Sequence, residues 1–185
     1  MIFLGIGANL PSVTHGSPLA TCAAAIDVLN GREVTVIRRS RWYASQPLPP
    51  SDQPHYINGV LDVRTALAPG ALLNMLQDIE RVFGRRRSRR NAARTLDLDL
   101  LVYDDVVMED AATLALPHPR MHERAFVLRP LADLAPEWRH PRLGLSTLEM
   151  LAAVSPEQVV EALESGPGGD AQAADANRRA RRPLS

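Results

Sequence analysis

The sequence predicts an α+β protein with a ferredoxin-like βαββαβ core, in which helices flank a mostly antiparallel sheet. Three observations support this fold class. Apolar segments typical of strands occur at 2–7, 34–43, 56–65 and 95–103. Segments with helical spacing lie between the first and second of these strands and between the third and fourth. A chain of 185 residues also suits one domain with a sizeable core.

Local signals place the elements of the first half. Ser17 and Pro18 are typical of a helix start and predict a helix at 19–29, with Gly31 as its left-handed C-cap. The second strand follows at 34–43. The segment 44–54 contains four prolines and is therefore expected to form an irregular loop before the third strand.

The second half continues the pattern. Helical spacing is shown by Leu72, Leu76, Ile79 and Phe83, and Gly84 is expected to end that helix. Beyond the fourth strand we expect a short strand at 106–108, a helix at 122–134 with Pro130 inside it, a capped helix at 147–154 and a short helix after Ser155-Pro156. We expect one domain at 1–164, followed by a disordered tail at 165–185.

Composition limits the classes of function. The 21 basic and 21 acidic residues cancel, so no global charge favours nucleic acid or a membrane surface. All basic residues are arginine, which excludes a P-loop lysine or Schiff-base lysine from the sequence given. The single cysteine, Cys22, rules out an internal disulfide and predicts a reducing cytoplasm. No apolar run reaches the length that spans a bilayer.

One segment, 84–103, combines two kinds of charge. Its first part holds six arginines, and its second part holds Asp97 and Asp99 between leucines. Strand alternation puts both carboxylates on one face, with Cα atoms about 6–7 Å apart. Paired carboxylates suit hard divalent cations, and arginines suit phosphates. The segment therefore suggests a site for a nucleoside triphosphate and metal.

Each of these signals has a structural alternative. The aspartates are also compatible with the solvated face of an edge strand, and the arginines with a basic loop or a nucleic-acid patch. His118 lies between two prolines and either binds phosphate or stabilises a turn. Tyr56 and Phe126 are either core aromatics or a stacking pair for a flat ring, whose edge Asn58 could read.

Six motifs in this order resemble the 6-hydroxymethyl-7,8-dihydropterin pyrophosphokinase family of folate biosynthesis. They are GIGANL at 5–10, DQPHYIN at 52–58, Glu80 with GRRR at 84–87, RTLDLD at 94–99, LPHP at 116–119 and ERAFVL at 123–128. The resemblance covers about residues 1–136. It implies a Mg²⁺-dependent transfer of pyrophosphate from ATP to the pterin hydroxymethyl group, with release of AMP.

The resemblance also implies a role for each matching residue. Asp97 and Asp99 would hold two Mg²⁺ ions, and with Arg85, Arg87 and Arg94 they form the expected catalytic set. The expected ATP contacts are Gln77, Arg85, Arg87, Arg94, Leu100, His118 and Arg124. The expected pterin contacts are Ser45, Gln46, Leu48, Tyr56, Asn58, Asp97 and Phe126. No nucleic acid or membrane partner is expected, and we expect a monomer.

The sequence departs from the family pattern at four places. Ala8 replaces a serine, Ser45-Gln46 replaces Thr-Pro, and Asn91-Ala92-Ala93-Arg94 stands where the family has Trp-Gly-Pro-Arg. The segment before Leu116, with Thr113 and Ala115, is also less typical. These changes leave a second interpretation open, a weakened or specialised pterin- or nucleotide-binding paralogue. A third interpretation, a nucleic-acid-binding module, predicts strongly salt-dependent binding of oligonucleotides.

Overall fold

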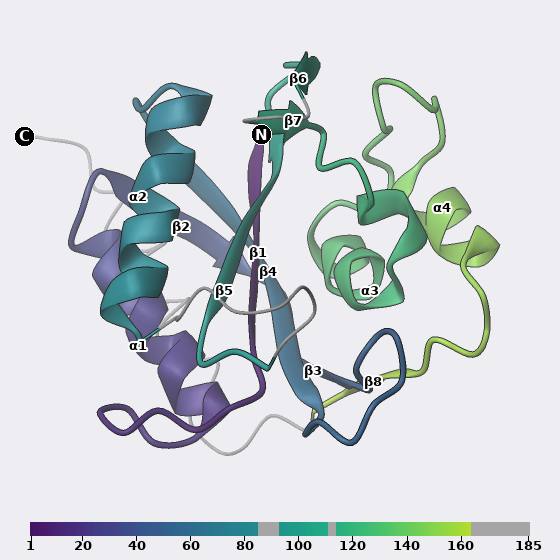
Figure 1. Cartoon of the computed structure of the whole chain (residues 1–185). Helices are drawn as coiled ribbons and strands as arrows, with labels where there is room; N and C mark the ends of the chain where they lie inside the picture. Colours follow the sequence, from purple (N-terminus) through teal and green to yellow (C-terminus); the bar gives the residue numbers. More distant parts are fainter. Residues whose placement is uncertain (85–92, 111–113, 164–185) are drawn as a thin grey trace, which may run out of the picture.

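The computed structural model of the chain describes residues 1–84, 93–110 and 114–163. Its centre is a six-stranded sheet with the order β5–β1–β4–β3–β8, in which β2 also pairs with β4. The strands are β1 (Ile2–Ala8), β2 (Val34–Arg39), β3 (Tyr43–Ser45), β4 (Tyr56–Thr65), β5 (Asp97–Tyr103) and β8 (Val160–Ala162). Figure 1 shows α1 (Pro18–Asn30) and α2 (Pro69–Val82) on one side of this sheet, and α3 (Ala125–Leu134) and α4 (Thr147–Ala153) on the other.

The strand pairing confirms the predicted ferredoxin-like core. Strand β4 lies between β1 and β2 and is antiparallel to both, while β1 lies between β4 and β5 and is antiparallel to both. Helix α1 connects β1 to β2, and α2 connects β4 to β5. Two βαβ units are thus interleaved in one sheet, as in a split βαβ arrangement.

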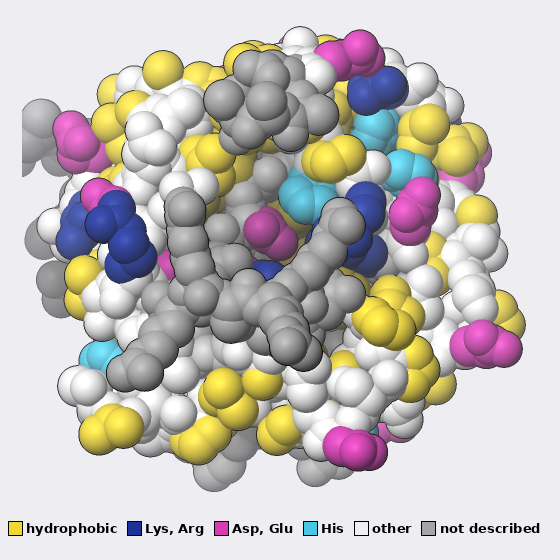
Figure 2. Space-filling model, in the orientation of Figure 1, with side chains coloured by type: hydrophobic (Ala, Val, Ile, Leu, Met, Phe, Trp, Pro, Cys, Tyr) yellow, Lys and Arg dark blue, Asp and Glu magenta, His cyan; other side chains and the backbone are white. Residues whose placement is uncertain are grey.

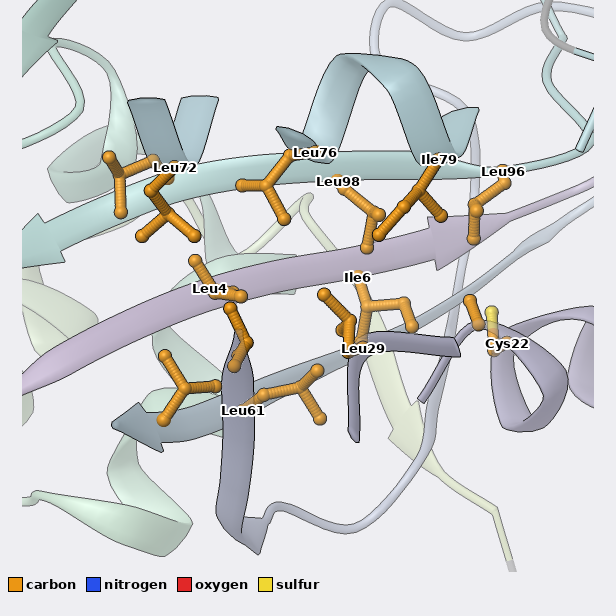
Figure 3. Close-up of a cluster of buried hydrophobic side chains, with 14 of the residues drawn as sticks. Leu4, Ile6, Cys22, Leu29, Leu61, Leu72, Leu76, Ile79, Leu96 and Leu98 are labelled. Carbon is orange, nitrogen blue, oxygen red and sulfur yellow. The ribbon is translucent and has the colours of Figure 1, made fainter. Parts of the chain in front are cut away.

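The larger core lies between the sheet and the helices α1 and α2. Leu4 and Ile6 of β1 meet Leu29 of α1 and Leu76 and Ile79 of α2 there, and Figure 3 shows these side chains pointing toward one another. All five are at most 3% exposed. Each such burial contributes about 1.5–3 kcal/mol, so this face of the sheet anchors the fold.

The opposite face of β5 changes character along its length. Leu98 and Leu100 belong to the α1/α2 core, so Asp97 and Asp99 face the other side. The register with β1 then shifts at Phe3/Leu4, and both Leu101 and Val102 join a second buried cluster with Phe3. At this β-bulge the polar part of the strand ends and its apolar part begins.

The predicted second strand, 34–43, is divided. Strand β2 ends at Arg39 and β3 begins at Tyr43. Between them, Ser40 Oγ accepts a hydrogen bond from the Val60 backbone N–H at 3.0 Å. Trp42 lies so close to Gly59 that a Cβ there would be 2.9 Å from the indole. Packing of the tryptophan on this glycine accounts for the break.

Two further boundaries differ from the prediction. The short strand expected at 106–108 is β6 (Met108–Asp110), which pairs with β7 (Leu114–Leu116). The helix expected at 122–134 begins as a 3₁₀ turn, η1 (Met121–Glu123), and becomes α3 only after an extended Arg124. The extended residue lets the chain turn sharply between η1 and α3.

The prediction of a short helix after Ser155-Pro156 is wrong, and so is the prediction of a left-handed cap at Gly31. After Ser155 the chain makes a turn and then forms β8 along β3, so a sheet partner decides the structure of this segment. Gly31 has φ −80° and is not left-handed, whereas Gly84 has φ +85°. The capping box of Ser146 and Glu149 is confirmed. The tail expected at 165–185 lies outside the described residues.

Candidate active site

A cavity of about 530 Å³ opens on the sheet face that α1 and α2 do not cover. Its base includes Gly5 and Gly7 of β1, and its sides come from β3, β4, β5 and the segment 118–127. Figure 2 shows acidic, histidine and arginine side chains gathered in a hollow near the middle of the view. The cavity therefore collects polar groups beside two positions of β1, Gly5 and Gly7, that carry no side chain.

The aspartates of β5 stand in register with these glycines. Asp99 pairs with Gly5 and Asp97 with Gly7, and both carboxylates line the cavity, half-buried. Between them, the Leu98 backbone N–H donates to the buried Glu80 Oε1 of α2 at 2.8 Å. This bond ties the outer side of β5 to α2 and fixes the strand that presents both carboxylates.

Arg94 is held against this pair. Its guanidinium Nη1 donates to Asp97 Oδ1. Its backbone N–H donates to Asn9 Oδ1 at 2.7 Å, and its carbonyl accepts from the N–H groups of Asn9 and Leu10 at 3.0 Å. Burial alone would lower the pKa of Arg94, but the negative charge of Asp97 and its hydrogen bond outweigh burial, so the pKa of Arg94 is raised. The arginine therefore stays positively charged beside the carboxylates.

Asn9 has a wider role, because it joins three segments. The side chain is 1% exposed. Besides its contacts with Arg94, its Nδ2 donates to the Pro54 carbonyl at 3.2 Å and to Gln53 Oε1 at 3.4 Å. The end of β1, the proline-rich loop and the start of β5 are thereby fixed to one another next to the cavity.

The predicted ring-binding residues line the other part of the same cavity, namely Ser45, Gln46, Leu48, Tyr56, Asn58 and Phe126. Asn58 Nδ2 donates to Ser45 Oγ at 2.9 Å, and both side chains are buried. This bond fixes the orientation of the amide. Burial raises the pKa of Tyr56, whose hydroxyl donates to Gln53 at 3.4 Å.

His118 and Arg124 line the side of the cavity formed by the segment after β7. Burial, and to a smaller degree the charges of Arg124 and Arg120, lowers the pKa of His118 to about 4. The Arg120 backbone N–H donates to His118 Nδ1 at 3.2 Å. The imidazole is therefore neutral at pH 7 and carries its proton on Nε2, where it can donate to a ligand oxygen.

The remaining predicted residues lie elsewhere. Gln77 is exposed on α2, and the Leu100 side chain is buried in the α1/α2 core, so neither lines this cavity. Arg85 and Arg87 lie outside the described residues. Glu123 also lines the cavity, although the motif that contains it suggested no role for this residue. The two glycines had an available signal, since alternate strand residues without side chains leave space on one face.

The comparisons with known proteins agree with this geometry. The family model described as 7,8-dihydro-6-hydroxymethylpterin-pyrophosphokinase matches residues 3–136. A 2-amino-4-hydroxy-6-hydroxymethyldihydropteridine pyrophosphokinase from Synechocystis sp. is 42% identical over 82% of this chain and 74% of that protein. One of the same name from Pseudomonas aeruginosa is also 42% identical, over 82% of this chain and 90% of that protein.

Solved structures support the fold. The chain resembles the crystal structure of Plasmodium falciparum HPPK-DHPS with a TM-score of 0.60 and 14% identity. The match covers 82% of this chain and 43% of that one, so the chain spans less than half of that protein. Within the part of the chain that the structure describes, no helix has the length and apolar character needed to cross a bilayer. The sequence matches show that the chain belongs to the 7,8-dihydro-6-hydroxymethylpterin-pyrophosphokinase family.

Proposed function

We propose that the protein transfers pyrophosphate from ATP to the hydroxymethyl group of 6-hydroxymethyl-7,8-dihydropterin, giving AMP and the pterin diphosphate. One observation carries this proposal. A single cavity has the carboxylates of Asp97 and Asp99 in one part and the aromatic and amide side chains of Tyr56, Phe126 and Asn58 in the other. A triphosphate and a flat ring can thus be placed side by side.

The carboxylate pair fits Mg²⁺. Both are hard oxygen donors on one strand face, and among the described residues no group of three or more His, Cys, Asp or Glu side chains forms a closed metal site. Mg²⁺ commonly takes one or two carboxylates and completes its shell with water and phosphate oxygens. Bound there, two Mg²⁺ ions would neutralise phosphate charge and orient the attacking hydroxyl. Asp97 and Asp99 would hold them.

The arginines and His118 suit the phosphates and the remainder of ATP. Arg94 and Arg124 supply positive charge in the cavity that Asp97 and Asp99 line, and the His118 Nε2–H supplies a neutral donor. By family position alone we also propose ATP contacts for Arg85 and Arg87, which lie outside the described residues, and for Gln77 and Leu100, which do not line this cavity. In such a site, transfer depends on positioning and charge stabilisation, and no side chain has to act as a nucleophile.

The part of the cavity lined by Ser45, Gln46, Leu48, Tyr56, Asn58 and Phe126, here called the ring slot, suits the pterin. Tyr56 and Phe126 would stack on its two faces. The Nδ2 atom of Asn58 donates a hydrogen bond to Ser45 Oγ, which fixes the direction of the amide. The Oδ1 atom of Asn58 can then accept a hydrogen bond from an N–H group at the edge of the ring. Ser45, Gln46 and Leu48 would line the slot. The pterin oxygen then attacks the β-phosphorus, the bond from the β-phosphorus to the oxygen bridging it to the α-phosphorus breaks with AMP as the leaving group, and the hydroxyl proton is released.

The nature of the nucleotide product tests the proposal. Incubation with ATP, Mg²⁺ and 6-hydroxymethyl-7,8-dihydropterin should release AMP in equal amount to the pterin diphosphate, measured by chromatography. Formation of ADP would replace pyrophosphoryl transfer with ordinary phosphoryl transfer. Binding of both ligands without any product would support the weakened paralogue.

Two matched substitutions test the metal pair. Asp97→Asn and Asp99→Asn should each lower kcat by a factor of about 1,000 or more, because loss of charge stabilisation at the reacting phosphate costs several kcal/mol. The exposed Asp105, on the turn after β5, gives a control variant, Asp105→Asn. If an Asp97 or Asp99 variant kept most of its activity, the two-metal account would fall.

A further inference from the structure

The segment 155–163 contacts both elements that flank the ring slot, namely α3, which carries Phe126, and β3, which carries Ser45. It follows the residues matched by the family model, 3–136. Toward one end, the Gln158 side chain reaches Ala125 at the start of α3, one residue before Phe126. At the other end, β8 extends the sheet beside β3, where Val160 pairs with Ser45. A small second pocket is lined by Ser45 of β3, by the loop that follows β3, by Phe126 and by residues 157–160 of this segment.

Gln158 makes the contact with α3. Its Oε1 accepts a hydrogen bond from the Ala125 backbone N–H at 3.0 Å, and its Nε2 donates to the Glu123 carbonyl at 2.9 Å. The first N–H groups of a helix have no partner within the helix, and no side chain of Arg124 caps α3. The Gln158 amide therefore replaces the missing cap and bridges the junction between η1 and α3.

Gln158 is itself held in place. Its backbone N–H donates to the Ser155 carbonyl at 3.1 Å, and the Leu163 N–H donates to the Trp42 carbonyl at 2.8 Å. The amide is thus fixed between a turn and a strand that is paired with β3. A displacement of the segment would move the start of α3 relative to Ser45.

We propose that Gln158 is a positioning residue for the pterin: it sets the separation between the Phe126 ring and the sheet side of the slot. The inference rests on the proposed function, in which the pterin lies against Phe126. The required chemistry is narrow, because one side-chain group must accept from Ala125 and donate to Glu123. A carboxylate at this position keeps the acceptor and loses the donor, and an aliphatic side chain loses both.

Three variants and a double-mutant cycle test the proposal. Pterin binding is measured by fluorescence titration with 6-hydroxymethyl-7,8-dihydropterin in the presence of Mg²⁺ and a non-hydrolysable ATP analogue. Gln158→Leu should raise the pterin Kd at least fivefold, and Gln158→Glu should raise it less. Glu161→Gln, an exposed change on β8, is the matched control and should leave Kd within twofold of the parent value.

The cycle separates positioning from general destabilisation. In a Phe126→Ala background, Gln158→Leu should change the pterin Kd by less than twofold, since the ring that it positions is gone. A role in overall stability would give the same factor in both backgrounds. Without any ligand, hydrogen exchange of the Ala125 amide should be faster in Gln158→Leu than in the parent. An unchanged exchange rate would show that the bridge does not hold this amide.

The outcomes also distinguish this inference from the proposed function. If the parent protein binds the pterin and releases AMP while Gln158→Leu binds it equally well, the positioning role is overturned and the function stands. If the parent protein binds no pterin, both are overturned. If the pterin Kd rises in Gln158→Leu only with Phe126 present, the positioning role is supported.

Discussion

Gly5 and Gly7 show how single residues create the space in which the site is built. In the sheet register Gly7 stands between Asn58 and Asp97, and Gly5 stands next to Asp99. Side chains at either position would project between the carboxylates and the ring slot. Their absence leaves a flat backbone surface against which two ligands can approach each other.

The two glycines are not equivalent, which gives a first prediction. A Cβ at Gly7 would lie 3.2 Å from Asn58 Oδ1 and 3.3 Å from the Ile57 carbonyl, whereas one at Gly5 would have only ordinary contacts at 3.6 Å. Gly7→Ala should therefore displace the Asn58 amide and weaken pterin binding about tenfold, or about 1.4 kcal/mol. Gly5→Ala should cost less. Equal losses in titrations of both variants would contradict this explanation.

His118 makes stability depend on pH. Its pKa is about 4 in the folded protein against 6.5 as its ordinary value, so between these values the unfolded state binds more protons. Stability should rise with pH across this window, by up to about 3 kcal/mol from this group, and the contribution is lost as pH falls toward 4. Urea unfolding at pH 4.5, 5.5 and 7 measures it. In His118→Gln the pH slope should be smaller, and an unchanged slope would argue against burial of a neutral imidazole.

At the scale of elements, α3 is fastened to the sheet by one carboxylate. Asp133 of α3 accepts hydrogen bonds from the Arg41 backbone N–H at 3.0 Å, from Arg41 Nη2 at 2.7 Å and from the Tyr43 hydroxyl at 3.0 Å. Burial works against its ionised form, but the bonds from Arg41 and Tyr43 outweigh burial and lower its pKa. These contacts of Asp133 with Arg41 and Tyr43, here called the clamp, fix the helix that carries Phe126 to the strand that carries Ser45.

Removal of this clamp should destabilise the protein. Asp133→Ala should cost about 1.5–3 kcal/mol of unfolding free energy, because hydrogen bonds to a charged group are lost and the buried Tyr43 hydroxyl loses the acceptor of its proton, keeping only the bond that it accepts from Arg41. Since the folded pKa is lowered, this contribution is present above pH 4 and disappears at more acid pH. Asp78→Ala, which removes an exposed ion pair with Arg81, should change stability far less. Similar losses in chemical denaturation would refute the difference.

The sequence predicted those elements whose signals are local. Period-two alternation located β4 at its observed bounds, and Ser146 with Glu149 located the start of α4. The break after Arg39 depends on Trp42 packing on Gly59, and β8 exists because β3 offers it an edge. Contacts between residues far apart in sequence decide both features, so no local pattern could indicate them.

The site was predictable to a similar extent. Alternation alone placed Asp97 and Asp99 on one face, and the structure puts them there. The family resemblance indicated the aromatic pair, which lines the same cavity. Neither source indicated Asn9 as the junction of three segments or Gln158 as the cap of α3. Those roles arise from backbone groups that only the folded chain brings within hydrogen-bond distance.

On the scale of the whole molecule, one face of the sheet packs the larger core and the other face carries the cavity. The face toward α1 and α2 is filled by the larger core, while the other face is covered by α3 and α4 over only part of its area. The second cluster, around Phe3 and Leu101, ends where the polar cavity begins. Ligands bound there would complete a face that the protein leaves partly open.

Ligand binding should therefore stabilise the whole domain, with a metal-dependent part. At a ligand concentration 100 times Kd, the gain is about 2.7 kcal/mol, which raises Tm by about 5–10 °C in a domain of this size. A non-hydrolysable ATP analogue with Mg²⁺ should raise Tm in thermal unfolding, and EDTA should remove most of the rise. In Asp99→Asn the Mg²⁺-dependent part should disappear, while Asp105→Asn should behave like the parent protein. A nucleotide-induced rise in Tm that is equal with Mg²⁺ and with EDTA would remove the metal from the account of ATP binding.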